Sequence, residues 1–178
     1  MISLGPNERQ FLEAIDTILA NTTTEHKNFL VHAYASSENS YGTEQMLALL
    51  SSIDEKYRMH SRKDRQLAKL MLLYHKIKND TSLSDGQNTH KNAQLAYDDL
   101  LKHTTLSDQN REIVYGGIVS TFKEVAYFPE KETPEPIKLF LELHASTISI
   151  QQEASNLTQF RKKYLATLIR SLFAEKHT

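Results

Sequence analysis

The side chains with the clearest potential for chemistry form a basic cluster within residues 56–69. The cluster comprises Lys56, Arg58, His60, Arg62, Lys63, Arg65 and Lys69. Asp64 is the only acidic residue in this stretch, so the local charge is strongly positive. A basic corner between two helices can hold a phosphate group, an acidic peptide or an anionic lipid head group, and the positive end of the second helix adds to its attraction. The alternative is a solvated helix face and turn, which is what a charge run usually means.

Histidine is the second residue type considered, because the chain contains eight of them. A helical metal site needs His or carboxylate ligands three or four residues apart, on one face of the helix. No two histidines have that spacing and no Glu-x-x-His occurs, so the sequence predicts neither a metal centre nor a cofactor. His144 lies on the apolar face of a helix predicted over residues 137–144, which favours a hydrogen-bonded histidine in the core.

Nucleophilic and acid–base chemistry has little support in the sequence. The chain has no cysteine, which excludes disulfides, thiol nucleophiles and thiolate metal sites. No G-x-S-x-G motif occurs. The acids Glu130, Glu132 and Glu135 lie in a proline-rich segment, where exposed carboxylates gain no tuning of their pKa. We therefore expect a protein that is not an enzyme. The alternative is an enzyme or small-ligand protein with a site assembled across helices, around His60, Arg62 and Arg65 or around His144.

The pair Gly116-Gly117 falls inside a predicted helix, where each glycine costs roughly 1 kcal/mol relative to alanine. Something must offset that cost, and close packing of another helix against Gly117 is the interpretation we favour. A kink that shapes a groove is the functional alternative. A phosphate-binding loop is not indicated, because no strand precedes the pair and the glycine spacing is wrong.

The elements that position these residues are amphipathic helices. In residues 43–79 the apolar positions follow the i, i+3, i+4, i+7 pattern of one helix face. These positions are Met46, Leu49, Leu50, Ile53 and Tyr57, followed by Leu67, Leu70, Met71, Tyr74 and Ile77. The same pattern predicts about eight helices. Their approximate ranges are 6–20, 24–35, 43–58, 61–79, 91–102, 107–125, 137–144 and 155–176. Outside residues 43–79, the side chains expected in the core include Phe29, Tyr97 and Leu101.

Polar and proline-rich segments separate these helices. Thr24, Ser61 and Ser107 are the expected N-caps of three of them. The segment Asp80–Thr89 is predicted to be a mobile, exposed loop because its composition cannot bury apolar surface. The segment 128–136 holds three of the four prolines and is predicted to be a turn. A shift of 47 residues aligns two successive helix pairs, which favours a repeated helix–turn–helix unit as in solenoids.

These observations predict a single all-α domain over residues 1–178, with antiparallel helical hairpins in an α-solenoid-like arrangement or an irregular bundle. The formal net charge of −1 argues against nucleic-acid binding. The N-terminus has no basic and apolar leader, and the longest apolar run, Leu70–Tyr74, is far too short for a transmembrane segment. We therefore expect a soluble, cytoplasmic or otherwise intracellular protein; export without a classical signal is compatible with this sequence.

The predicted function is a non-enzymatic protein–protein interaction module, of the adaptor, chaperone-like or effector type. Its expected partner is another protein, acidic or phosphorylated, bound at the basic cluster. This prediction rests on elimination, since a stack of helical hairpins offers grooves and the chain offers no catalytic motif. A groove lined by aromatic side chains would favour the binding module. A closed pocket with converging polar groups and perturbed titrations would favour the enzyme.

Overall fold

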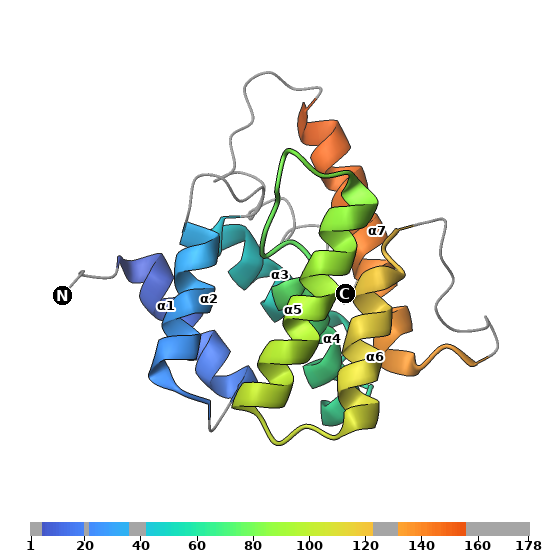
Figure 1. Cartoon of the computed structure of the whole chain (residues 1–178). Coiled ribbons are helices and arrows are strands. Elements are labelled where there is room, and N and C mark those ends of the chain that lie inside the picture. The colour runs from blue at the N-terminus through green and yellow to red at the C-terminus, as the bar shows by residue number, and fades with distance from the viewer. Residues whose placement is uncertain (1–4, 20–21, 36–41, 123–131, 156–178) are drawn as a thin grey trace.

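The computed structural model describes residues 5–19, 22–35, 42–122 and 132–155, and in the last stretch it describes side chains as far as residue 147. This part of the chain is all-α, as the sequence predicts (Figure 1). Its seven helices are α1 (Pro6–Ile18), α2 (Thr24–Ala35), α3 (Thr43–Lys56), α4 (Arg62–Tyr74), α5 (Asp85–His103), α6 (Asp108–Val119) and α7 (Glu135–Ser155). The helix predicted over residues 155–176 lies outside the described residues. None of the described helices is both long enough and apolar enough to cross a bilayer.

Short polar side chains start several of these helices by accepting a backbone N–H. The Ser61 hydroxyl accepts from the Asp64 amide at 3.1 Å, and the Ser107 hydroxyl accepts from the Asn110 amide at 3.2 Å. Both predicted caps are therefore confirmed. At α2 the cap is Thr23 rather than the predicted Thr24, because the Thr23 hydroxyl accepts a hydrogen bond from the backbone amide of His26.

Helix α5 begins at Asp85, earlier than the predicted start at residue 91. Ser84 and Gln87 form a reciprocal capping box in which each side chain accepts the other's backbone N–H, at 3.2 and 2.9 Å. The Asn88 side chain also ties the new helix to Asp80, by accepting from its amide and donating to its carbonyl. The loop predicted over 80–89 is therefore helical from residue 85, because a capping motif outweighs a polar composition.

Further boundaries of α4, α6 and α7 differ from the prediction, and α6 ends at Val119 rather than near residue 125. Helix α4 ends at Tyr74 rather than at residue 79. The backbone N–H and C=O groups that follow the helix form hydrogen bonds with the Asn92 side chain of α5. Asn92 accepts from the Lys78 amide and donates to the carbonyls of His75 and Lys78. Helix α7 begins at Glu135, inside the predicted proline-rich turn, because a proline is well tolerated in a first helical turn. It continues unbroken to Ser155, since no glycine or proline interrupts it.

Helix α4 lies at the centre of the described fold. It packs against α1, α3, α5, α6 and α7, while α5 and α6 form an antiparallel hairpin on one side (Figure 1). In a solenoid each unit contacts only its neighbours, so this packing is that of an irregular bundle. All ten apolar positions predicted for residues 43–79 are buried. The core continues through Phe11, Ile15, Leu30, Tyr34, Ala93, Ala96, Leu100, Val114, Ile118, Ile137, Phe140 and Leu143.

Several side chains expected in the core are less buried than predicted, among them Leu101, Tyr97 and Phe29. Leu101 is 55% exposed, because α5 packs along the stripe that ends at Leu100 and the next residue points about 100° away. Tyr97 is only partly buried. Phe29 is 37% exposed, with the Lys78 ammonium 5.7 Å from the centre of its ring.

The close approach predicted at Gly117 is confirmed. The buried side chain of Met71 on α4 lies directly over Gly117 on α6. A Cβ atom at Gly117 would lie 3.1 Å from Met71 Cε and closer still to its sulfur. Glycine therefore allows the close contact here, because a side chain at this position would require the Met71 side chain to move.

Candidate functional site

The structure divides the predicted basic cluster into paired and unpaired cations. The Lys56 ammonium lies 2.7 Å from the Glu142 carboxylate of α7. Arg65 and Lys69 both reach Asp54 of α3, at 3.1 and 2.6 Å. These pairs connect α4 and α7 to α3, so part of the positive charge is neutralised within the fold.

The other members of the cluster lie at the corner between α3 and α4. Arg58, Arg62 and Lys63 are exposed, and within the described part of the chain no acidic side chain pairs with them. His60 is half-buried with its ring edge-on to Tyr57, at a centroid distance of 5.8 Å. The corner therefore presents three cations to solvent.

A hollow of about 240 Å³ opens beside this corner and is called the basic hollow below. One wall consists of four residues of α4 at helical spacing, Arg62, Arg65, Gln66 and Lys69. The remaining lining residues are Thr17 and Ile18 of α1 and Asp54 of α3. The arrangement brings together three of the predicted residues and leaves His60 outside the lining.

Charge in the basic hollow favours an anion. Three cations line it against the single carboxylate of Asp54, and the N-terminus of α4 adds its partial positive charge. Gln66 is held in place because its side-chain amide donates to the Ile18 carbonyl at 2.9 Å. The hollow can therefore bind an oxyanion through charged and neutral N–H donors.

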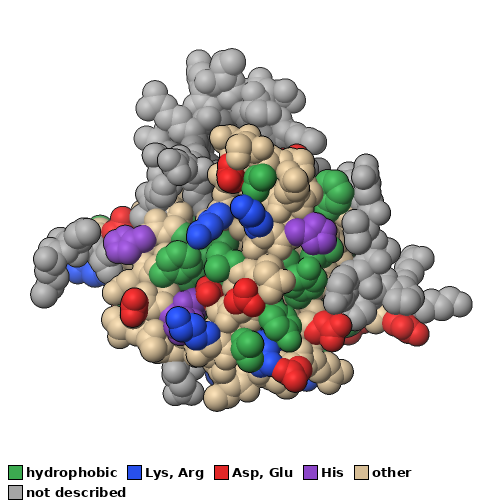
Figure 2. Space-filling view, in the orientation of Figure 1, with side chains coloured by type: hydrophobic (Ala, Val, Ile, Leu, Met, Phe, Trp, Pro, Cys, Tyr) green, Lys and Arg blue, Asp and Glu red, His purple; other side chains and the backbone are tan. Residues whose placement is uncertain are grey.

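A second hollow, of about 410 Å³, lies between α5 and α6 and is called the tyrosine groove below. Tyr97 and Tyr115 line it with their rings 6.5 Å apart and perpendicular, and Arg111 lies over the Tyr97 ring at 5.5 Å. Figure 2 shows the face that carries α2, α5 and α6, where side chains of both charges are interspersed with apolar ones. Among the described residues on this face, Figure 2 shows no continuous basic surface.

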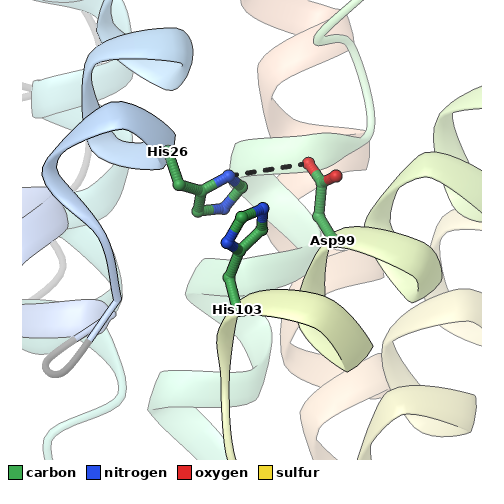
Figure 3. Close-up of side chains that lie close together, drawn as sticks. All are labelled: His26, Asp99 and His103. Carbon is green, nitrogen blue, oxygen red and sulfur yellow. Dashed lines mark ion pairs between the residues drawn. The ribbon is translucent and has the colours of Figure 1, made fainter.

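A third group of side chains was not predicted from the sequence. His26 of α2 lies against Asp99 and His103 of α5, and one potential ligand atom from each lies within 4.8 Å of the other two (Figure 3). His26 Nδ1 is 3.9 Å from Asp99 Oδ2, and the two imidazole rings stack with centroids 4.2 Å apart. The second nitrogen of His26, Nε2, lies 2.9 Å from the hydroxyl of Tyr74.

Burial sets the electrostatics of this histidine cluster. Desolvation, followed by the charge of His103, lowers the pKa of His26 to about 4. Desolvation also raises the pKa of Asp99, although His103 opposes that shift. Burial and the neighbouring Asp99 raise the pKa of Tyr74, so its hydroxyl stays protonated. The cluster therefore combines an uncharged imidazole with a carboxylate that is costly to ionise.

One signal in the sequence could have revealed part of this cluster. Asp99 and His103 are four residues apart on one helix, which is the ligand spacing sought above with a carboxylate in place of one histidine. A search for two histidines or for Glu-x-x-His passes over it. The third member, His26, could not have been found, because it is distant in the sequence and only the packing of α2 brings it close.

The predicted core histidine His144 is half-buried on α7. Its ring lies 5.9 Å from that of Phe140 and 5.3 Å from that of the buried His75. His75 Nδ1 donates to the Leu72 carbonyl at 2.8 Å, because a carbonyl can only accept. His144 therefore lies at a helix contact and lines neither the basic hollow nor the tyrosine groove.

The described fold thus belongs to the broad class of irregular all-α bundles. Comparison with protein-family models, with curated proteins and with solved structures finds no match for this chain. Function therefore has to be inferred from the side chains themselves.

Proposed function

We propose that the protein is a non-enzymatic interaction module that binds an acidic or phosphorylated segment of another protein through the basic hollow. The observation that carries this proposal is the alignment of Arg62, Arg65 and Lys69 on one face of α4, in a hollow lined by a single carboxylate. Surface ion pairs add little stability, so the excess of cations is more useful to a ligand than to the fold.

The shape of the hollow supports a phosphorylated or acidic side chain as its occupant. Its volume of about 240 Å³ lies below the range of roughly 300–1,000 Å³ typical of small-molecule pockets. A guanidinium group offers a planar fork of N–H donors that matches a phosphate or carboxylate. Asp54 already orients the Arg65 fork, which reduces the entropy lost on binding.

The lining residues offer little for catalysis. They comprise three cations, one carboxylate, one amide, an isoleucine and the hydroxyl of Thr17, which donates to the Glu13 carbonyl. No histidine stands beside that hydroxyl to act as its base. The alternative of an active site around His60, Arg62 and Arg65 therefore receives less support than binding.

The experiment is a titration followed by NMR of backbone amides. The probes are inorganic phosphate and one acidic peptide in two forms, with phosphoserine or serine at its centre. We expect the phosphopeptide to bind more tightly than the serine form, and its affinity to fall as salt rises. The amides of Arg62, Arg65, Gln66 and Lys69 should shift most.

Charge-reversal variants test whether the basic hollow and the exposed corner beside it, where Lys63 lies, are responsible. Arg62→Glu with Lys63→Glu should leave the fold intact and weaken phosphopeptide binding at least about tenfold. Arg9→Glu with Lys91→Glu makes the same change in net charge at exposed positions outside the lining and should bind like the wild type. Asp54→Asn removes the opposing charge but keeps an oxygen that can accept from Arg65, so it should strengthen binding.

Two outcomes would reject the proposal. Equal losses in both double variants would mean that only total charge matters. Loss of binding in Tyr97→Ala, together with insensitivity to salt, would assign recognition to the tyrosine groove instead.

A further inference from the structure

We propose that His26, Asp99 and His103 form a binding site for a divalent transition-metal ion, with Zn²⁺ as its expected occupant. The proposal goes beyond the interaction function, and none of the three side chains lines the basic hollow. Two imidazole nitrogens and one carboxylate oxygen are a common donor set for Zn²⁺. Within the described residues, this is where such donors from three side chains converge most closely.

The environment of the Asp99 carboxylate is the first physical reason to expect a cation in this cluster. Its Oδ2 atom is buried and lacks a hydrogen bond of good geometry within the described part of the chain, although a hydrogen bond with Tyr74 contributes to the pKa of this carboxyl. A buried polar atom without a partner costs roughly 1–3 kcal/mol, and more when it is charged. His26 Nδ1, at 3.9 Å, is too distant to donate a hydrogen bond. A cation between these two atoms would satisfy both.

The contact between His26 and Tyr74 is the second reason to expect a metal ion here. A metal-bound imidazole coordinates through one nitrogen and donates the N–H of the other to an oxygen that fixes its orientation. Here Nδ1 faces Asp99 while Nε2 lies 2.9 Å from the Tyr74 hydroxyl. Tyr74 is itself held, because it is fully buried in the core of α4. The arrangement therefore presents Nδ1 to the ion and anchors the far side of the ring.

Coordination requires one side chain to move. The rings of His26 and His103 are within 15° of parallel, and two stacked rings cannot both aim a lone pair at one ion. A tetrahedral Zn²⁺ site would also bring its ligand atoms to roughly 3.3 Å from one another, given bond lengths of about 2.0–2.1 Å. His103 must therefore turn toward Asp99.

His103 has the freedom to make that movement. It is the last residue of α5, it is only half-buried, and it lines a cavity of about 690 Å³ together with Gln66 and Lys102. His26 is held by the packing of α2 and by Tyr74. The cavity also provides the space in which a water molecule could complete a tetrahedral site, which three protein ligands leave open.

The test uses the full-length, tag-free chain after treatment with a chelator. ZnCl₂ is titrated by calorimetry, and CoCl₂ is titrated by visible absorption as a probe of coordination geometry. We expect one ion per chain, intense d–d bands typical of tetrahedral Co²⁺, and a higher melting temperature with Zn²⁺ because the ion binds the folded state. Imidazole ¹⁵N signals of His26 and His103 should shift when Zn²⁺ is added.

Matched variants separate this site from adventitious binding. Asp99→Asn and His103→Ala should each weaken Zn²⁺ binding at least about tenfold. The controls lie on the same helices and are exposed: Asp98→Asn and His90→Ala on α5, and His32→Ala on α2. Each control should bind like the wild type. Because His26 is buried, its loss could unfold the chain, so the test depends on the other two ligands.

Two results would overturn the proposal. If the wild type binds neither ion at millimolar concentration, the three side chains form only a metal-free contact between α2 and α5. If a control loses as much affinity as Asp99→Asn or His103→Ala, the ion binds elsewhere on the surface.

Discussion

The side chain of Met71 occupies the space that a Cβ atom on Gly117 would need, so the contact between α4 and α6 depends on both residues. Met71 is fully buried at the centre of the bundle. Its thioether fills the hollow that the bare glycine backbone leaves. This contact explains why a helix tolerates a residue of poor helix propensity.

Gly117→Ala should lower the free energy of unfolding by up to about 2 kcal/mol. Overpacking costs roughly 1–3 kcal/mol, and the better helix propensity of alanine returns only about 1 kcal/mol. In a Met71→Ala background the same substitution should become stabilising, because the obstructing atoms are gone. Urea unfolding of the four proteins in this double-mutant cycle measures the coupling. Additive effects would show that the two residues do not meet.

Leu70→Ala should lower the free energy of unfolding by roughly 2–5 kcal/mol, because Leu70 is fully buried in α4 and its truncation leaves a cavity. Leu101→Ala is the matched control, since Leu101 is 55% exposed, and its effect should stay below about 0.5 kcal/mol. Denaturant titration measures both. A loss at Leu70 as small as that at Leu101 would contradict the central position of α4.

Trypsin should first cut the described part of the chain after Lys78, close to the predicted loop, rather than after Lys91. Lys78 is exposed beyond the end of α4, whereas Lys91 lies inside α5. Asn92→Ala should accelerate the cut, because the Asn92 side chain makes three hydrogen bonds to the backbone of His75 and Lys78. Mass spectrometry of early fragments identifies the site.

Gln94→Ala is the control for this proteolysis experiment. Gln94 is an exposed residue of the same helix, and its side chain bonds only to that of Asp98 among the described residues. Its loss should leave the cleavage rate unchanged. A first cut inside α5 would mean that the capping box at Ser84 does not hold the start of that helix.

Acid should destabilise the fold through His75. Burial lowers the pKa of His75 well below its usual value, and the charges of His144 and Lys76 lower it further. Below about pH 6.5 the His75 imidazole is protonated in the unfolded chain but stays neutral in the folded chain. Stability is therefore unaffected by this group above pH 7 and falls by up to about 1.4 kcal/mol per pH unit as the pH drops toward 5.

His75→Asn should reduce that slope, since an amide does not titrate and can still donate to the Leu72 carbonyl. The buried His26, whose pKa is about 4, remains in this variant and keeps part of the acid sensitivity. The measurement is urea unfolding at pH 7, 6 and 5 with a chelator present. His90→Asn, at an exposed position, is the control. Equal slopes in all three proteins would show that the pKa of His75 is the same in the folded and unfolded chains.

The sequence by itself determined the fold class and most of the core. Apolar side chains recur at helical spacing through residues 43–79, and a helix has to bury such a stripe, so all ten of these positions are buried. The caps at Ser61 and Ser107 were also predictable, because each is a hydrogen bond between a hydroxyl and the backbone amide three residues later. Such a bond forms within one short segment and does not depend on the rest of the fold. Gly117 likewise signalled a close contact, although not its partner.

Tertiary structure decided everything that joins distant residues. In the sequence, the basic cluster is one charged stretch. The packing of the helices pairs Lys56 with an acid of α7, and pairs Arg65 and Lys69 with an acid of α3, while Arg62 stays exposed. Asp99 and His103 share a helix face in any model of α5, but His26 joins them only because α2 packs there. Helical periodicity reports which side of a helix is buried. It carries no information about which helix covers that side, and sites assembled between helices depend on that choice.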